Sequence, residues 1–231
     1  MPVVNITGAL GGSQFEPSIA VNILLPNIMC VVAVDTSAGP TRTGFYRSID
    51  GGQTWTTAIL PQPAGYEGAE APTIDYTFPS TFIVTVHVFN GENDGTIISY
   101  TSLDDGVTWT PPVFINRGYG LVVHNDEPFI ACDRTPGSPY RGNVYVGYTP
   151  LATAASSIFL QRSEDVASTW QIPSRISIQE VSMIGRPSGL DSQGKSTPVI
   201  SSRVLGVRMR YFGLPMTGAL HSSHLLAISP L

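Results

Sequence analysis

Acidic side chains recur at one kind of position along this chain, one or two residues before a proline that opens an apolar segment. The acidic residues are Glu16, Glu70, Asp126 and Glu127, and the prolines are Pro17, Pro72 and Pro128. Carboxylates that are forced together raise one another's pKa, and a carboxyl group that stays protonated can act as a general acid. If the fold brings these residues together, two of them have the chemistry to cleave a glycosidic bond.

A structural interpretation of the same residues competes with the catalytic one. A repeat protein can keep an acidic residue at the start of each strand to cap that strand or to keep the rim of the molecule soluble. The sequence favours this structural interpretation and leaves the catalytic one open. The two interpretations are distinguished by whether the four carboxylates converge in the folded chain.

Two further groups of residues have the chemistry of metal ligands. Residues 90–95, Asn-Gly-Glu-Asn-Asp-Gly, offer oxygen ligands at a calcium-like spacing but lack the bidentate Glu that closes an EF-hand loop. A polar hairpin turn explains this segment. His87 and His124 each stand alone in the sequence, where a hydrogen-bonded structural role is the commoner one. The sequence therefore predicts no metal site and no cofactor.

A repeated octamer, Ser-x-Asp-x-Gly-x-Thr-Trp, marks the elements that must position these side chains. Residues 48–55 and 102–109 match it fully, and residues 163–170 match it except for Ala167 in place of the glycine. Asp accepts hydrogen bonds from backbone amides a few residues on, and Gly supplies the positive φ of a tight hairpin. The pattern therefore predicts structural turns, formed by Ser48, Asp50, Gly52, Thr54, Trp55, Ser102, Asp104, Gly106, Thr108, Trp109, Ser163, Asp165, Thr169 and Trp170.

The third copy of the octamer raises a separate expectation. Ala167 has a Cβ, which makes the positive φ of such a turn costly. We therefore expect the third turn to differ from the other two in backbone shape or to carry strain.

Apolar segments between the turns predict four antiparallel strands per repeat, and no segment shows sustained helical periodicity. Each repeat begins at a proline, at 17, 72, 128 and 187, because proline is tolerated at the first residue of a strand. The expected strands are 18–22, 29–34, 44–48 and 54–59, then 73–76, 82–88, 97–102 and 108–114, then 129–132, 143–148, 158–163 and 169–172.

This repetition predicts an all-β propeller of four-stranded blades, with three blades and a partial or aberrant fourth. The whole chain, 1–231, is expected to be one domain or fragment, with blades at about 12–60, 66–116, 123–177 and, incomplete, 184–231. After Asp191 the chain has no acidic residue and no octamer, which favours a fragment or an altered reading frame. Open blade edges lead us to expect self-association.

Composition agrees with many short strands joined by turns. The 231 residues include 23 Gly and 19 Pro, and the formal net charge is −5. A net negative charge argues against a nucleic-acid or anionic-membrane partner, and no apolar stretch is long enough to span a membrane. Cys30 and Cys132 stand in apolar runs, which predicts buried free thiols.

The octamer resembles the Asp-box, or BNR repeat, of bacterial sialidase-like β-propellers. The likeness covers about residues 12–195 and is closest at 126–146. That family carries the octamer at the outer edge of each blade, far from the active site. The resemblance implies a carbohydrate-directed protein, glycan-binding or glycoside hydrolase-like, outside the cell or on its surface, although no signal peptide opens this chain. The rival hypothesis is a non-catalytic extracellular propeller that is a scaffold for protein interaction.

The resemblance also implies a set of active-site residues that the sequence meets only in part. Sialidases place three arginines, a Tyr–Glu nucleophile pair and an acid/base Asp on their inner strands. Tyr76 and Tyr140 have no Glu paired with them, and Arg42, Arg47 and Arg162 lie near the octamers. The sequence therefore predicts an incomplete catalytic set and a ligand site at the inner strands, formed by Glu16, Glu70, Asp126, Glu127 and Arg186.

Overall fold

The structure is a computed structural model of the chain. It describes residues 4–7, 11–91, 94–120, 122–151 and 157–177, and the backbone of residues 201–204, 207–210 and 227–229. These residues form strands, turns and connecting segments, with no helix among them. The search of this described part therefore finds no helix with the length and apolar character to cross a membrane. The chain divides into two compact units, Met1–Arg175 and Ile176–Leu231.

Three four-stranded antiparallel sheets make up the first unit, each with its strands in chain order. They confirm the predicted all-β fold of propeller blades. The strands are β1 (Gln14–Val21), β2 (Met29–Asp35), β3 (Arg42–Ser48) and β4 (Thr56–Ile59) in blade 1, β5 (Gly68–Thr77), β6 (Thr81–Phe89), β7 (Thr96–Ser102) and β8 (Val113–Asn116) in blade 2, and β9 (His124–Cys132), β10 (Val144–Leu151), β11 (Phe159–Ser163) and β12 (Ser174–Arg175) in blade 3.

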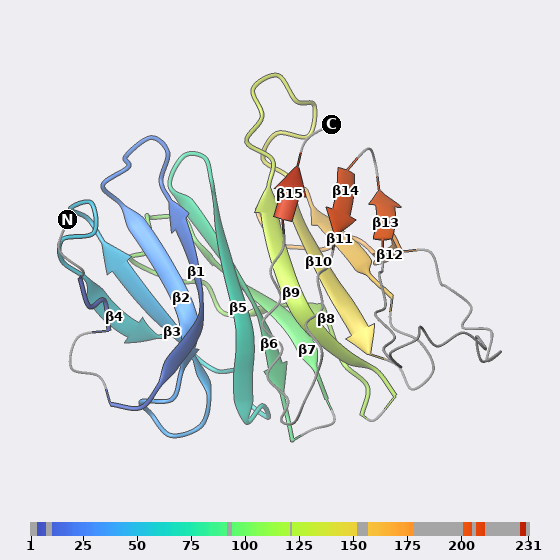
Figure 1. The fold of residues 1–231 in the computed structure, drawn as a ribbon, viewed down its shortest axis with the longest axis horizontal. Coiled ribbons are helices and arrows are strands. Elements are labelled where there is room, and N and C mark those ends of the chain that lie inside the picture. Colours follow the sequence, from blue (N-terminus) through green and yellow to red (C-terminus); the bar gives the residue numbers. More distant parts are fainter. Residues whose placement is uncertain are drawn as a thin grey trace, which may run out of the picture. The chain divides into compact units, whose positions relative to one another are not determined.

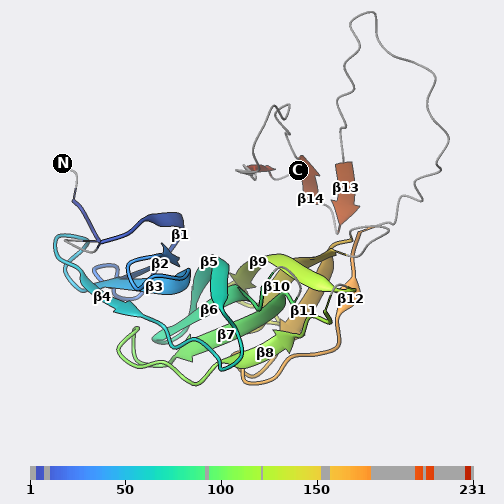
Figure 2. The same cartoon turned by 90° about the horizontal axis from the view of Figure 1, so that it is seen from below.

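The first strands of the three blades, β1, β5 and β9, lie side by side, and β4, β8 and β12 lie at the far edges (Figures 1 and 2). We call the first set the inner strands and the second set the outer strands. In the second unit, β13 (Ser201–Val204), β14 (Val207–Arg210) and β15 (Ala227–Ser229) form a three-stranded antiparallel sheet with β14 in the middle. This sheet falls within the range predicted for the incomplete fourth blade.

Apolar side chains of each blade pack against the next blade, which explains the continuously apolar strands of the sequence. Phe45 of blade 1 is buried against Trp109 of blade 2, with ring centroids 5.0 Å apart in an edge-to-face arrangement. Trp170 of blade 3 donates a hydrogen bond to the Ser99 hydroxyl of blade 2 at 3.4 Å. Trp109 and Trp170 thus pack blades 2 and 3 against the preceding blade. Cys30 and Cys132, the predicted buried thiols, are buried and free.

Each inner strand continues through its proline by means of a β-bulge, so the predicted starts at 18, 73 and 129 are too late. The ladder register shifts between Phe15 and Ser18 in β1 and between Glu70 and Thr73 in β5, and β9 has the equivalent shift. A bulged residue makes no ladder hydrogen bond, so proline is tolerated there inside a strand.

The residue before each proline has an unusual backbone conformation. The φ angles are 54° at Glu16, 48° at Ala71 and 51° at Glu127. This left-handed region is costly for residues with a Cβ, so the backbone is strained at the same place in all three blades. Strain of this kind persists only where the surrounding structure enforces it, and it clusters at functional sites.

The outer strands begin later than predicted. β4 begins at Thr56, β8 at Val113 and β12 at Ser174, whereas the expected starts were 54, 108 and 169. The physical reason lies in the octamer, because the backbone amide and hydroxyl of its Thr bind the Asp side chain of the turn. The Thr therefore belongs to the turn, and the strand starts only after it.

Candidate functional site

The octamer turns join the third and fourth strands of each blade, and their Asp side chains fold back onto their own turn. Asp50 accepts hydrogen bonds from the amides of Gln53 and Thr54 at 2.9 Å and from the Thr54 hydroxyl. The Ser48 hydroxyl donates to Asp50 at 2.8 Å and accepts from the amide of Gly52 at 2.9 Å. The corresponding Ser and Thr bonds recur at Asp104 and Asp165. The carboxylates of the outer edge are thus bonded inside their own turns.

These hydrogen bonds set the ionisation of the outer carboxylates. Bonds from the side chain and backbone of Thr54, followed by that of Ser48, lower the pKa of Asp50 to about 2. Bonds from Thr169 lower the pKa of Asp165 in the same way. At Asp104 the loss of some surrounding water acts in the opposite direction, but the bonds from Thr108 and Ser102 together outweigh it and the pKa is again lowered. A carboxylate with a lowered pKa is ionised at neutral pH and is a poor general acid.

The third turn keeps the backbone shape of the other two although it has no glycine. The two central φ angles are 73° and 88° at Gly51-Gly52, 59° and 81° at Asp105-Gly106, and 58° and 64° at Val166-Ala167. The expected difference in shape is therefore wrong, because the hydrogen bonds of Ser163 and Asp165 impose the same conformation. What remains is strain, since Val and Ala hold left-handed angles that favour glycine.

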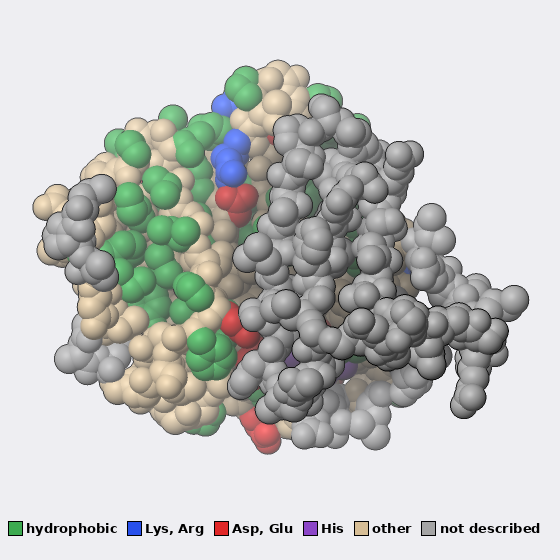
Figure 3. Space-filling view, viewed as in Figure 1, with side chains coloured by type: hydrophobic (Ala, Val, Ile, Leu, Met, Phe, Trp, Pro, Cys, Tyr) green, Lys and Arg blue, Asp and Glu red, His purple; other side chains and the backbone are tan. Residues whose placement is uncertain are grey.

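The four acidic residues of the predicted ligand site converge where the inner strands bulge. Glu16 lies on β1, Glu70 on β5, and Asp126 and Glu127 on β9. Burial, followed by the charges of Glu16, Asp126 and Glu127, raises the pKa of Glu70. Figure 3 shows acidic side chains along the band beside the exposed apolar surface of the first blade. The condition that the catalytic interpretation requires is therefore present, and Glu70 is the member whose surroundings favour the protonated form.

Glu16 also has a structural contact. Its carboxylate accepts a hydrogen bond from the backbone amide of Ala71 at 2.9 Å, which ties the bulge of blade 2 to blade 1. Asp126 accepts a bond from the amide of Glu127 at 2.8 Å, so it supports the bulge of blade 3. The contacts of Glu16 and Asp126 therefore support the structural interpretation, whereas the surroundings of Glu70 support the catalytic one.

Two histidines lie beside the carboxylates, which the sequence did not predict. His87 on β6 is paired with Glu70 in the ladder, and its Nδ1 lies 3.3 Å from Oδ1 of Asp126. The rings of His87 and His124 meet edge to face, with centroids 4.7 Å apart. The expectation that each histidine stands alone is therefore wrong. One signal was available, since His124 and Asp126 are two apart on a strand and so share a face.

His87 is almost fully enclosed, with 3% of its surface exposed. Burial lowers its pKa to about 4, partly opposed by the charge of Asp126 and reinforced by His124. Its imidazole is therefore neutral at pH 7. Neither ring nitrogen has a hydrogen-bond partner among the residues that the structure describes.

The other residues considered for sialidase chemistry do not join this cluster. Arg42 and Arg47 donate to backbone carbonyls of blade 2 at 2.6 Å each, and Arg162 pairs with Glu164 at 2.7 Å. Tyr76 is fully buried and its hydroxyl donates to a backbone carbonyl, so it is no nucleophile. Tyr140 lies in an exposed loop that follows β9. Arg186 lies outside the described residues, as does part of the loop 90–95.

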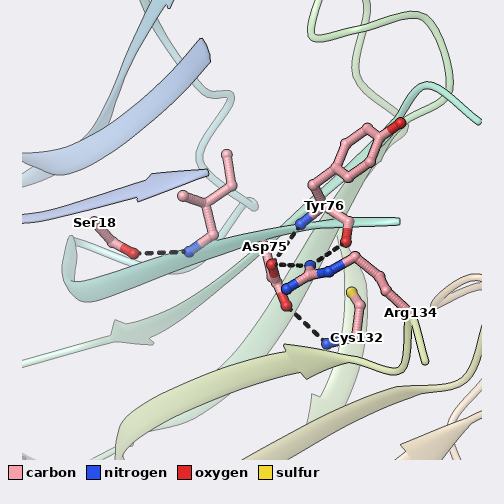
Figure 4. Close-up of polar contacts among 6 residues, drawn as sticks. Ser18, Asp75, Tyr76, Cys132 and Arg134 are labelled. Atoms are coloured by element: carbon pink, nitrogen blue, oxygen red, sulfur yellow. Dashed lines mark hydrogen bonds and ion pairs between the residues drawn. The ribbon is translucent and has the colours of Figure 1, made fainter. Parts of the chain in front are cut away.

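The inner strands belong to separate sheets and share no backbone hydrogen-bond ladder, so side chains link them to one another. Asp75 on β5 accepts from the amide of Cys132 at 2.8 Å and forms an ion pair with Arg134 (Figure 4). The Ser18 hydroxyl accepts from the amide of Ile74 at 3.2 Å. These contacts hold the three bulges in a fixed relation, and the sequence did not indicate them because their partners lie in different blades.

No protein-family model matches the chain, and no curated protein matches it in sequence. Solved structures share its fold. An α-L-arabinanase of Penicillium chrysogenum complexed with arabinobiose superposes with a TM-score of 0.54 and 20% identity, covering 70% of this chain and 49% of its own. The GH93 α-L-arabinofuranosidase of Fusarium graminearum with arabinobiose has a TM-score of 0.59 and 13% identity, covering 93% and 61%. A Trypanosoma rangeli sialidase in complex with 2,3-difluorosialic acid has a TM-score of 0.50 and 14% identity, covering 86% and 33%.

The chain thus spans 49% and 61% of the lengths of the first two proteins. At these identities the likeness establishes the fold, that of β-propeller glycosidases. The predicted resemblance to sialidases holds at the level of the fold, which arabinanases and arabinofuranosidases share.

Proposed function

We propose that this chain binds a neutral glycan at the bulges of the inner strands, and that the carboxylates gathered there contact it. The observation that carries the proposal is the convergence of Glu16, Glu70, Asp126 and Glu127 from three successive blades. Carboxylates accept hydrogen bonds from sugar hydroxyls. The strained bulges that present them are the kind of backbone feature that clusters at ligand sites.

Electrostatics favour a neutral sugar over sialic acid. The charges that act on Glu70 are those of Glu16, Asp126 and Glu127, all of the same sign as the carboxylate of a sialic acid. Like charges a few ångströms apart repel one another even when solvent partly screens them. Two of the structures that share the fold were solved with arabinobiose, a neutral disaccharide, and they support this choice.

The same site has the parts for glycoside hydrolysis. Glu70, whose surroundings favour the protonated form, is suited to protonate the leaving oxygen, and a neighbouring ionised carboxylate is suited to act as base or nucleophile. Phe129, two residues after Glu127 on β9, is 55% exposed and offers an aromatic face for a sugar ring. The proposal is therefore a carbohydrate-directed propeller of the glycoside hydrolase class.

Titration calorimetry with arabinobiose, alongside chromatography of the products, tests the proposal. We expect binding that is weakened in Glu127→Gln and in Phe129→Ala, with 3′-sialyllactose not bound. Glu164→Gln is the matched control, since Glu164 is exposed and pairs with Arg162 beside the outer octamer. Binding without cleavage would identify a non-catalytic glycan-binding propeller. Equal affinity of Glu127→Gln, Phe129→Ala and the unsubstituted chain would contradict the proposed site.

A further inference from the structure

Three ligand groups from two blades meet beside the carboxylate cluster. One ring nitrogen each of His87 and His124 and one carboxylate oxygen of Asp126 all lie within 4.8 Å of one another. His87 comes from β6 of blade 2, and the other two come from β9 of blade 3. Because His124 and Asp126 are two residues apart on one strand, both project from the same face toward His87.

The buried histidine is the observation that calls for a ligand. His87 is 97% enclosed, yet neither ring nitrogen has a hydrogen-bond partner among the described residues. A buried polar atom left without a partner costs about 1–3 kcal/mol, so such atoms are rare in folded proteins. Nδ1 of His124 is also buried and has no hydrogen-bond partner in the described part of the chain. An electron-pair acceptor between the two rings binds one of these nitrogens from each residue.

The distance between His87 and Asp126 fits a tetrahedral metal ion. Two ligand atoms at about 2.0–2.1 Å from Zn²⁺ and at the tetrahedral angle are about 3.4 Å apart. The 3.3 Å between Nδ1 of His87 and Oδ1 of Asp126 has this length. One ring nitrogen of His124 lies within 4.8 Å of a ligand atom of each of the other two residues. Gly95 leaves room for that ring, since a Cβ there would stand 2.8 Å from it.

Charge favours a cation at this place. Asp126 is one of the carboxylates whose charges raise the pKa of Glu70, together with Glu16 and Glu127. A divalent ion bound by Asp126 offsets this mutual repulsion. The two imidazoles decide the class of metal, because Ca²⁺ and Mg²⁺ take oxygen ligands whereas Zn²⁺ and its neighbours accept nitrogen.

We propose that His87, His124 and Asp126 form a binding site for a divalent transition metal of the zinc class, with a fourth position open to water or a ligand. The site joins β6 of blade 2 to the inner strand β9 of blade 3, so the metal also holds the two blades together. Asp126 belongs to both proposed sites, but the test below measures metal binding alone, so its failure leaves the proposed glycan binding untouched.

The test measures Zn²⁺ binding to the full chain after treatment with EDTA, in competition with a chromophoric chelator at pH 7. The other two histidines of the sequence, His221 and His224, are first changed to Gln so that they contribute no site. We expect one equivalent of Zn²⁺ to bind, with no displacement by an equal concentration of Ca²⁺. At a hundredfold excess over the Kd, Zn²⁺ should raise the midpoint of thermal unfolding by about 5–10 °C.

Substitutions of the ligands separate this site from adventitious binding. His124→Gln and Asp126→Asn should each weaken Zn²⁺ binding by at least about tenfold, as loss of a metal-site contact does. Both positions are partly exposed, so these variants test the site even if a change at the buried His87 prevents folding. Glu164→Gln, an equivalent loss of one negative charge, should bind as before. No binding in the His221→Gln/His224→Gln chain, or unchanged affinity in both ligand variants, would overturn the proposal.

Discussion

The carboxylates at the outer edge of each blade and those at the inner strands have surroundings that shift the pKa in opposite directions. Asp50 at the outer edge accepts bonds from two amides, the Thr54 hydroxyl and the Ser48 hydroxyl, and its pKa falls to about 2. Glu70 at the inner strands is partly buried among other carboxylates, and its pKa rises. Donors stabilise the charged form, whereas burial and like charges disfavour it.

The comparison teaches that the number of acidic residues in a repeat says little about where its chemistry lies. The outer carboxylates belong to the most regular part of the sequence, yet their oxygens are occupied by their own turns. The inner carboxylates occupy a less regular pattern, yet three blades bring them together. Four predictions test this division between stability at the outer edge and ligand chemistry at the inner strands.

The largest effect is expected at Glu70. If Glu70 protonates the leaving oxygen, Glu70→Gln should slow cleavage of arabinobiose by about 10²-fold or more. Cleavage of an aryl arabinofuranoside with a good leaving group should fall much less, because that group departs without protonation. The measurement is the rate of arabinose release from both substrates. An equal loss on both substrates would assign Glu70 another role.

At the outer edge the effect should appear in stability. Ser102→Ala removes the hydroxyl oxygen that accepts a 2.8 Å hydrogen bond from the buried amide of Gly106. We expect the free energy of unfolding to fall by about 1–3 kcal/mol in urea denaturation, as for a buried donor left without a partner. Asp104→Ala should cost less, because this side chain is exposed. Glycan affinity should be unchanged in both variants, and a selective loss of affinity would break the comparison.

A smaller effect concerns acid stability. The pKa values of Asp50, Asp104 and Asp165 are lowered in the folded chain, against about 3.9 when unfolded. Their contribution is therefore present above pH 4 and is lost as the pH falls from about 4 toward 2. Asp50→Asn combined with Asp165→Asn should flatten this decline in the thermal midpoint. An unchanged pH profile would show that other groups govern acid unfolding.

The last prediction is that no sialidase activity is detected. The chain should release no sialic acid from a fluorogenic sialoside, because the charges around Glu70 repel the substrate carboxylate. A known sialidase assayed in parallel confirms that the assay works. Turnover by this chain that disappears in Arg186→Ala would show that an arginine beyond the described residues completes a sialidase site.

The sequence alone determined the features whose partners lie close along the chain. The octamer predicted its turns because Asp50 accepts hydrogen bonds from groups no more than four residues away, so all the partners lie within one short motif. The apolar runs predicted the strands, and their repetition predicted the blades. The bulges were not predicted. A proline at a bulge inside a strand and a proline at the start of a strand give the same sequence pattern, and only the register with the neighbouring strand distinguishes them.

Only the tertiary structure decided where the carboxylates and histidines meet. His87 and Asp126 belong to different blades, and their 3.3 Å contact depends on how β6 packs beside β9. The raised pKa of Glu70 likewise depends on charges from β1 and β9. Electrostatic energies change with the distance between groups and with their burial, and both are set by the packing of one blade against another.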